Sequence, residues 1–320
     1  MSVRILQGDS REVLRTLPDG SFHTCVTSPP YFGLRDYGMS GQIGLEDTPE
    51  AFVAQLVEVF REVRRVLRDD GALWLNIGDS YAGSWGARGR GAATKAARPD
   101  IEAKHGTAAP NRHGFGRWGV KPKDRMMMPA RVALALQGDG WWLRDEIVWS
   151  KPNPMPMSVT DRTTPAHEMI YLLSKSARYY YDHEAVREDA VSDHSSGNGF
   201  VGRQGGSKRV GPQSGGQGTA DEWSGVGGKR NRRSVWTVSV KAFREAHFAT
   251  YPSDLIEPCI LAGSPRGGDV LDPFGGAGTT GLVAQRLGRD CTLIELNPEY
   301  AAMARRRIEK DAGMFAEVAA

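Results

Sequence analysis

Hydrophobic residues recur at two spacings along the first 80 positions. Three short apolar runs have the length of a buried strand, at residues 3–7, 23–27 and 72–77. Two segments with helical spacing lie between them, at residues 10–17 and 48–67. Asp9 or Ser10 can cap the first helix, and we expect residues 69–71 (Asp-Asp-Gly) to end the second. Strands that alternate with helices predict a parallel sheet with helices on both faces.

The same alternation returns in the rest of the chain. Residues 129–136 are predicted as a helix, 142–150 as a strand and 168–174 as either. From residue 252 to 310 the pattern is helix, strand, glycine-rich turn, helix, strand and helix, with the two helices that follow the turn beginning near 282 and after 295. No internal repeat is present. The whole chain is therefore predicted to be an α/β protein.

Two stretches lack this periodicity and are rich in Gly, Lys and Arg. Residues 83–125 contain ten Lys and Arg against three acidic residues, and residues 187–244 contain ten against five, although the net charge of the chain is only +3. Basic segments in a nearly neutral chain favour a polyanionic partner, and solvated basic loops are the alternative. The chain therefore divides into five segments: residues 1–80, a basic flexible loop at 81–128, residues 129–186, a Gly-rich basic region at 187–244 and residues 245–320.

Several classes of protein are disfavoured by composition. No run of eighteen apolar residues is present, which argues against a membrane protein, and the first residues do not resemble a signal peptide. Cys25, Cys259 and Cys291 are far apart and form no CxxC pair, so neither disulfides nor a zinc site are expected, and no metal is predicted. A cytoplasmic enzyme is the simplest expectation.

A glycine-rich turn follows the predicted strand that ends in Asp272, Pro273 and Phe274. It runs through residues 275–281, and the next strand ends in Glu295. Glycines allow a sharp turn and a close approach to a ligand, and an acid at the tip of the next strand can accept both hydroxyls of a ribose. Residues 276–281 also satisfy GxGxxG, so a nicotinamide dinucleotide is an alternative to S-adenosylmethionine, and a tight packing turn without a ligand is a third interpretation.

A second distinctive turn follows the strand at 23–27. It consists of Ser28, Pro29, Pro30 and Tyr31. Two prolines fix φ and remove two backbone donors, which leaves carbonyl acceptors beside the Ser28 hydroxyl and the flat Tyr31 ring. Such a cluster suits a planar base that carries an amino group, whereas a rigid turn with a packed tyrosine is the structural alternative.

Together these motifs resemble the amino-methylating DNA methyltransferases with the permuted, β-type motif order. In that family (D/N/S)PP(Y/F) precedes FxGxG, as residues 28–31 precede residues 274–278 here. Other stretches are also similar to family elements: residues 8–10, 72–79, 147–154 with His167 and Glu168, and 247–252. The resemblance implies a Rossmann-like S-adenosylmethionine-dependent methyltransferase fold with a mostly parallel central sheet and a small irregular target-recognition region. It makes residues 1–80 the catalytic half of the methyltransferase domain, with its continuation at 129–186, and residues 245–320 the cofactor-binding half. The loop at 81–128 is then expected to contact DNA, and the region at 187–244 to recognise the target.

The resemblance also implies the site residues. Catalysis is assigned to Ser28, Pro29, Pro30 and Tyr31. Binding of S-adenosylmethionine is assigned to Asp9, Thr250, Asp272, Phe274, Gly275, Gly276, Gly278, Thr279, Thr280 and Glu295. Contact with double-stranded DNA is assigned to Arg88, Arg90, Lys151, Lys229, Arg230, Arg232 and Arg233. The implied reaction is methylation of an exocyclic amino group on a flipped base.

The resemblance leaves several choices open. Serine at position 28 favours cytosine N4 as the target, with adenine N6 as the alternative. A non-catalytic DNA-binding protein with this fold and a nicotinamide-dependent oxidoreductase are the rivals from other classes. Carbon-5 methylation of cytosine is disfavoured because Cys25 precedes the turn of residues 28–31, the proline loop, and no Pro-Cys occurs in that loop. A homodimer and a cognate restriction endonuclease are compatible with the family, and the sequence selects neither.

Overall fold

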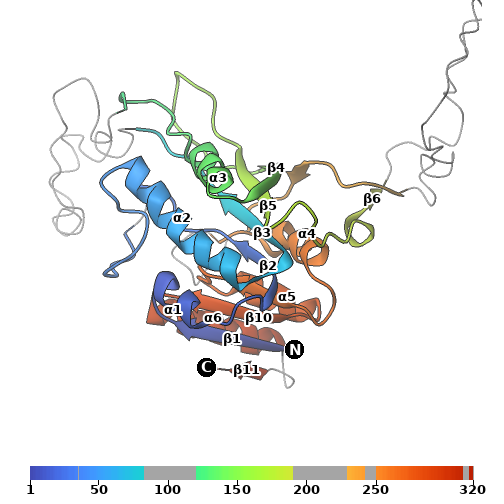
Figure 1. Ribbon diagram of the computed structural model, residues 1–320. Coiled ribbons are helices and arrows are strands. Elements are labelled where there is room, and N and C mark those ends of the chain that lie inside the picture. The colour runs from blue at the N-terminus through green and yellow to red at the C-terminus, as the bar shows by residue number, and fades with distance from the viewer. Residues whose placement is uncertain (35, 83–119, 190–228, 242–249, 313–316, 320) are drawn as a thin grey trace, which may run out of the picture.

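The computed structural model describes residues 1–34, 36–82, 120–189, 229–241, 250–312 and 317–319. Within these ranges the chain forms a nine-stranded sheet in the order β11-β1-β10-β9-β2-β3-β5-β4-β8, with helices packed on it (Figure 1). The sheet strands are β1 (Ser2–Gln7), β2 (Phe22–Thr27), β3 (Leu67–Ile77), β4 (Trp142–Ser150), β5 (His167–Ser174), β8 (Val235–Thr237), β9 (Asp269–Asp272), β10 (Asp290–Glu295) and β11 (Glu317–Ala319). The helices are α1 (Ser10–Thr16), α2 (Pro49–Val66), α3 (Met128–Gly138), α4 (Ser253–Gly263), α5 (Thr279–Arg286) and α6 (Pro298–Ala312), with the short η1 (Glu184–Val186) and the strand pair β6 (Glu188–Asp189) and β7 (Lys229–Arg230) beside them.

The sheet is mostly parallel, as the sequence predicts. Only β5 runs antiparallel to its neighbours β3 and β4, and every other pairing of the described sheet is parallel. In the middle of the sheet β2 pairs with β9, so Cys25 faces Leu271 in register. Strands from the two ends of the chain therefore lie next to each other, and the turns after β2 and β9 leave the same edge of the sheet.

Each face of the sheet is covered by three helices. Figure 1 shows α1, α2 and α3 on one face and α4, α5 and α6 on the other. Side chains alternate between two hydrophobic cores along a strand: Leu271 of β9 packs with the first group of helices and Val270 with the second. The periodic apolar face of α2 supplies Phe52, Leu56 and Phe60 to the first core, and all three are fully buried.

Most predicted elements are confirmed, and the ambiguous segment at 168–174 is the strand β5. The prediction that residues 69–71 end the second helix is wrong. The helix α2 ends at Val66, and Leu67 already has extended backbone and pairs with Phe22 of β2. The register shifts just after this pair, which leaves Asp69 and Asp70 exposed at the start of a long strand. Burial of Leu67 in the sheet outweighs the local turn preference of the two aspartates and the glycine.

The helix after the glycine turn also differs from the prediction. It begins at Thr279 rather than near residue 282, because Gly278 adopts the left-handed conformation that ends the turn and starts α5. The two predicted basic segments lie largely outside the described residues: residues 83–119 of the first and 190–228 of the second are not among them. In the described part no helix is long and apolar enough to cross a membrane.

Candidate active site

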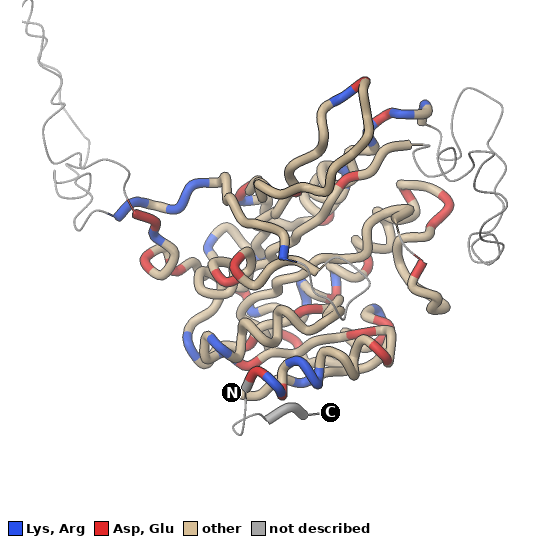
Figure 2. Tube along the Cα trace, turned by 180° about the vertical axis from the view of Figure 1, so that it is seen from behind, with Lys and Arg blue, Asp and Glu red and all other residues tan. Residues whose placement is uncertain are grey.

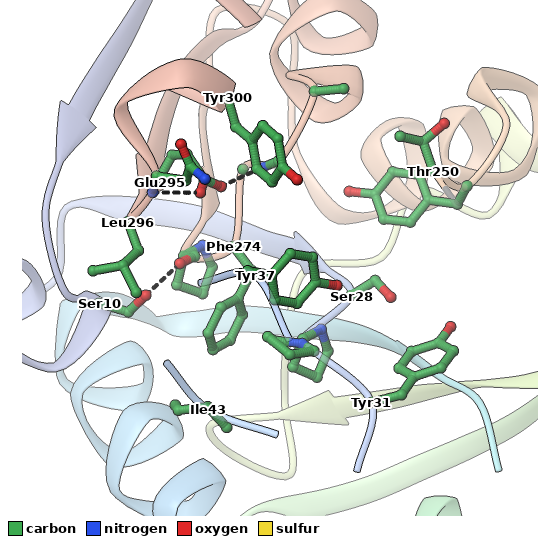
Figure 3. Close-up of a pocket in the computed structure, with 18 of the residues that line it drawn as sticks. Ser10, Ser28, Tyr31, Tyr37, Ile43, Thr250, Phe274, Glu295, Leu296 and Tyr300 are labelled. Carbon is green, nitrogen blue, oxygen red and sulfur yellow. Dashed lines mark hydrogen bonds between the residues drawn. The ribbon is translucent and has the colours of Figure 1, made fainter. Parts of the chain in front are cut away.

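A pocket of about 220 Å³ opens where β1, β2, β9 and β10 end. Figure 3 shows Glu295 and Tyr300 toward one end, Ser28 and Tyr31 toward the other, and the rings of Phe274 and Tyr37 between them. Predicted site residues in its lining are Asp9, Ser28, Pro29, Pro30, Tyr31, Lys151, Thr250, Phe274, Gly275, Gly276, Thr279 and Glu295. The fold thus joins the two motifs that the sequence places near opposite ends of the chain.

The turn after β9 is held by its neighbour β10. The Gly275 amide donates to the Ile294 carbonyl at 2.8 Å, and the Gly276 amide donates to Glu295 Oε2 at 2.7 Å. The Asn297 amide donates to the other Glu295 oxygen, Oε1, at 2.8 Å. Glycine is needed at Gly276 and Gly278, which have φ of 50° and 75°. The carboxylate of Glu295 is therefore fixed at the pocket wall.

Burial changes the acidity of this carboxylate. Withdrawal from water raises the pKa of Glu295 above its usual 4.5, although hydrogen bonds from the backbone of Asn297, Gly276 and Leu296 act in the opposite direction. Each carboxylate oxygen has two lone pairs. Glu295 therefore keeps acceptor capacity for a ligand in the pocket.

The start of α1 forms the neighbouring part of the wall. Asp9 caps this helix by accepting the Arg11 amide at 2.8 Å, and it also forms an ion pair with the Arg11 guanidinium. The hydrogen bond from that guanidinium lowers the pKa of Asp9. The Ser10 hydroxyl donates to the Pro273 carbonyl at 2.5 Å, which ties α1 to the turn after β9 (Figure 3).

Three residues predicted to bind the cofactor lie outside the pocket lining. Asp272 and Thr280 are buried beneath it, and Gly278 turns the chain into α5. Asp272 accepts hydrogen bonds from Thr27 at 2.6 Å and Thr280 at 2.5 Å, and from Tyr251 at 3.0 Å. Burial raises the pKa of Asp272 despite these donors. Asp272 therefore links the end of β2, through Thr27, to the turn after β9, through Thr280. It does not line the pocket.

The proline loop after β2 places Tyr31 against the end of β3. A Cβ atom on Gly78 would lie 2.5 Å from Tyr31 Cε2, so only glycine permits this approach. The Tyr31 hydroxyl donates to Glu168 Oε2 at 2.7 Å. Burial and the charge of Glu168 raise the pKa of Tyr31 well above its usual 10, so the hydroxyl keeps its proton. The ring is thereby fixed at both its edge and its hydroxyl.

Lys151, predicted to contact DNA, lines the pocket instead of the outer surface. It forms an ion pair with Glu168, and the two side chains are only 16% and 18% exposed. Its ammonium nitrogen lies 4.2 Å from the centre of the Trp149 ring. This position places Lys151 beside the proline loop, because its partner Glu168 also binds Tyr31.

The other predicted DNA contacts are only partly described. Arg88 and Arg90 lie outside the described residues. In the stretch from Lys229 to Arg233, which is blue in Figure 2 beside the acidic β6, Arg230 and Arg233 both donate to Glu188 Oε1, at 2.9 and 2.6 Å. The Arg232 guanidinium lies 4.6 Å from the Trp236 ring centre. These arginines are thus engaged within the protein, while Lys229 is exposed.

Cysteine chemistry has no support in this geometry. All three cysteines are free and buried, and burial raises the pKa of Cys25 well above its usual value. Cys25 lies inside β2 and does not line the pocket. Across the described residues, no group of three His, Cys, Asp or Glu side chains is arranged to hold a metal ion.

Several lining residues carried no sequence signal. Tyr37, Leu296 and Tyr300 contribute to the wall, yet they lie in loops or at the start of α6 without a recognisable pattern. Asn76 looks like one more residue of a buried strand in the sequence, although it lines the pocket. Tyr251 lies in the stretch 247–252 that resembles a family element, but the resemblance assigns it no role there; in the structure it lines the pocket and bonds to Asp272.

Comparison with known proteins agrees with this site. A family model described as DNA methylase of the N6/N4 type matches residues 22–306. The type II methyltransferase M.Cfr9I of Citrobacter freundii is 46% identical over 312 residues, which cover 95% of this chain and 87% of that protein. The type II methyltransferase M.SmaI of Serratia marcescens is 44% identical over 307 residues, covering 96% and 91%.

Solved structures share the fold at low sequence identity. The PvuII DNA methyltransferase, described as cytosine-N4-specific, superposes with a TM-score of 0.63 at 19% identity, covering 98% of this chain and 90% of its own. A putative DNA modification methylase of Thermus thermophilus, solved with S-adenosyl-L-methionine, has a TM-score of 0.58 at 24% identity and covers 99% of both chains. With its fold, its pocket and relatives matched over nearly their whole length, the chain belongs to the N6/N4 family of type II DNA methyltransferases.

Proposed function

We propose that this chain transfers a methyl group to the N4 amino nitrogen of a cytosine extruded from double-stranded DNA. The observation that carries the proposal is the shared pocket of residues 28–31 and the turn after β9. One side of this pocket offers carboxylates and glycine backbone, and the other offers a hydroxyl, a proline carbonyl and an aromatic ring. A methyl donor and a planar acceptor can therefore meet there.

The residues at the β9–β10 side fit S-adenosylmethionine. The carboxylate oxygens of Glu295 line the pocket wall and are assigned to accept ribose hydroxyls, and Phe274 and Leu296 provide apolar surface for the adenine ring. When bound, this cofactor supplies a methyl group on a positively charged sulfur. Asp9 also lines the wall and is the acceptor we assign to the adenine amino group, while Asp272, Gly278 and Thr280 support the turn from outside the pocket.

The proline loop is assigned to the target base. Ser28 and the Pro29 carbonyl accept the two hydrogens of the amino group, which draws the nitrogen lone pair out of conjugation with the ring. Tyr31 stacks on the base, and the absence of a side chain at Gly78 leaves room for the tyrosine ring in this position. Holding the nitrogen in line with the methyl group provides most of the rate. Extrusion of the base from the duplex costs a few kcal/mol.

Ser28 favours cytosine over adenine in this assignment, because serine at this motif position accompanies N4 activity more often in the family that the chain resembles. We further propose a cytoplasmic enzyme that acts on duplex DNA, with the segments at 81–128 and 187–244 as the DNA-contacting regions. A cognate restriction endonuclease and a homodimer are consistent with the proposal and are tested separately. Assaying the products of neighbouring genes for DNA cleavage tests the first, and analytical sedimentation of the purified protein tests the second.

The decisive experiment is to incubate the protein with unmethylated genomic DNA and S-adenosylmethionine and to analyse the nucleosides by mass spectrometry. We expect N4-methylcytosine. N6-methyladenine would keep the fold and the cofactor but reverse the target base. If protein that binds the cofactor yields no methylated nucleoside, a non-catalytic DNA-binding role replaces the proposal.

A further inference from the structure

The ion pair of Lys151 and Glu168 is the feature of the pocket that methyl transfer by Ser28 and Tyr31 does not explain. Lys151 directly follows β4 and Glu168 lies near the start of β5, so two neighbouring strands present the pair together. Both side chains are more than four-fifths withdrawn from water. Burying two charges is costly and is not required for a stable core, since apolar residues of similar size serve equally well. The pair therefore calls for a role in the site.

Both carboxylate oxygens of Glu168 accept hydrogen bonds from donors of the protein. Its Oε1 binds Lys151, and its Oε2 accepts the Tyr31 hydroxyl at 2.7 Å and the Asn76 amide nitrogen at 3.4 Å. Asn76 is itself oriented by donating to the Met169 carbonyl at 3.1 Å. Glu168 is thus a fixed anchor that positions Lys151 relative to the catalytic loop.

Lys151 keeps hydrogen-bonding capacity for a ligand. Its ammonium group has three donors, and among the described residues only Glu168 accepts one of them. The ring of Trp149 packs beside the ammonium at 4.2 Å, and the backbone amide of Lys151 donates to the Ala166 carbonyl at 2.8 Å. Lys151 therefore lies in the pocket wall, held by Glu168 and Trp149, and its ammonium group can donate further hydrogen bonds to a ligand.

The edge of cytosine complements this arrangement. Next to its amino group the ring carries two acceptors, N3 and then O2, whereas adenine carries N1 and then a C–H group. Once Ser28 and the Pro29 carbonyl hold the amino group, the two acceptors extend along the base edge away from it. A cation with free donors stabilises two adjacent acceptors better than one acceptor and an apolar hydrogen.

We infer that Lys151, positioned by Glu168, reads the target base by donating hydrogen bonds to N3 and O2 of cytosine, and that the pair determines specificity for cytosine over adenine. This inference rests on the proposed function, because it assumes that the base lies against Ser28 and Tyr31. Glu168 acts as a positioning residue in it, since its oxygens are used by Lys151, Tyr31 and Asn76.

The test combines a change of one ring atom of the substrate, N3 of the target cytosine, with a substitution of Lys151 in the enzyme. Once methylation mapping with the wild-type enzyme has located the target cytosine, two duplexes are compared: one with cytosine and one with 3-deazacytosine, in which N3 is replaced by C–H. We expect kcat/KM of the wild type to be about 10- to 100-fold lower on the analogue, the loss typical of a hydrogen bond from a charged donor. Lys151→Met should be slower on cytosine but should treat the two duplexes alike, within about threefold.

Controls separate recognition from folding. Lys310→Met changes an exposed lysine in the last turn of α6 and should discriminate as the wild type does. The double variant Lys151→Met/Glu168→Gln leaves no unpaired carboxylate, and it should still fail to discriminate while binding the cofactor normally in calorimetry.

Two results would overturn the inference while leaving the proposed function intact. These are discrimination by Lys151→Met equal to that of the wild type, and a wild-type enzyme that methylates both duplexes equally well. A wild type that methylates no cytosine at all refutes the proposed function first, and the inference with it.

Discussion

The loop after β2 and the turn after β9 leave adjacent parallel strands at one edge of the sheet, yet they are held in different ways. The turn is fixed by the next strand of the chain, β10, through the bonds from Gly275 to Ile294 and from Gly276 to Glu295. The loop is fixed from a distance: Tyr31 bonds to Asn76 of β3, 45 residues on, and to Glu168 of β5, 137 residues on. The turn after β9 is thus held by contacts within a short stretch of the chain, whereas the loop after β2 is held by strands that are distant in sequence.

Under the proposed function, this difference separates cofactor binding from catalysis. A locally built turn can keep its shape when distant residues change, so cofactor affinity should be insensitive to changes around Tyr31. The proline loop depends on several strands, so small displacements in any of them should reach the base that we assign to it. Asp272 is the point where the two regions meet, because it bonds both Thr27 and Thr280. Substitutions on either side of this point should affect different steps of the reaction.

Ser28→Ala is expected to have the largest effect. It removes one of the two groups that we assign to the target amino nitrogen, and loss of one such preorganised group typically lowers kcat by about 10²–10³-fold. Ser28 belongs to the loop after β2 rather than to the turn after β9, so the dissociation constant for S-adenosylmethionine should stay within about twofold of the wild type. Single-turnover methylation and calorimetry measure the two quantities.

Ser21→Ala provides the matched control, because Ser21 lies just before β2, at the end of the strand remote from the loop, and its hydroxyl bonds locally to the Pro18 carbonyl. It should leave both quantities unchanged. Near-normal turnover of Ser28→Ala would show that the pocket has been assigned to the wrong loop.

Gly78→Ala tests the remote support of the loop. The added Cβ would lie 2.5 Å from Tyr31 Cε2, so the tyrosine ring must move. A displacement near 1 Å in a catalytic site can lower the rate about 10²-fold, whereas cofactor affinity should not change. Gly138→Ala is the control, since nothing lies within 4 Å of a Cβ at that position. Equal rates for the two variants would mean that the position of Tyr31 is not critical.

Glu295→Gln addresses the local turn. The amide keeps the shape of the side chain but loses the charge, and hydrogen bonds to a charged group contribute about 1.5–3 kcal/mol. We therefore expect cofactor affinity to fall by about 10- to 100-fold, while the rate at saturating cofactor changes by less than about threefold. Glu299→Gln, an exposed glutamate at the start of α6, should bind normally. A large loss of saturated rate with intact affinity would reverse the roles of the two regions.

The same contrast decides what the sequence could predict. The strand, glycines and acid of the turn lie within residues 269–295, so their meeting follows from local geometry once the strands are recognised. The proline loop was recognisable as a motif, but its partners Gly78 and Glu168 are remote, and their contacts with Tyr31 depend on the order of strands. Lys151 is predicted to contact DNA or to lie near the flipped base, and its ion pair with Glu168 depends on the pairing of β4 with β5, which sequence spacing does not reveal. Asp272 and Thr280 are predicted to bind the cofactor, and the burial of their side chains depends on contacts with Thr27 and Tyr251 that the sequence does not reveal.

The smallest expected effect is on the pH dependence of cofactor binding, and it distinguishes the carboxylate of Glu295 from that of Asp9. Ionised Glu295 accepts hydroxyl hydrogen bonds and protonated Glu295 does so poorly. Burial raises the pKa of Glu295 above 4.5, so its protonated fraction grows as the pH falls through that raised value. The pKa of Asp9 is lowered by Arg11, so Asp9 stays ionised over the same range.

Affinity for S-adenosylmethionine should therefore weaken on acidification from a pH above 4.5, approaching about tenfold per pH unit, the slope of a single proton. Titration calorimetry between neutral pH and the onset of acid unfolding measures this slope. Glu295→Gln should abolish it, because the variant has no proton to gain at this position, whereas Ser28→Ala should retain it. A slope that persists in Glu295→Gln would assign the titration to another group and would remove Glu295 from the ribose site.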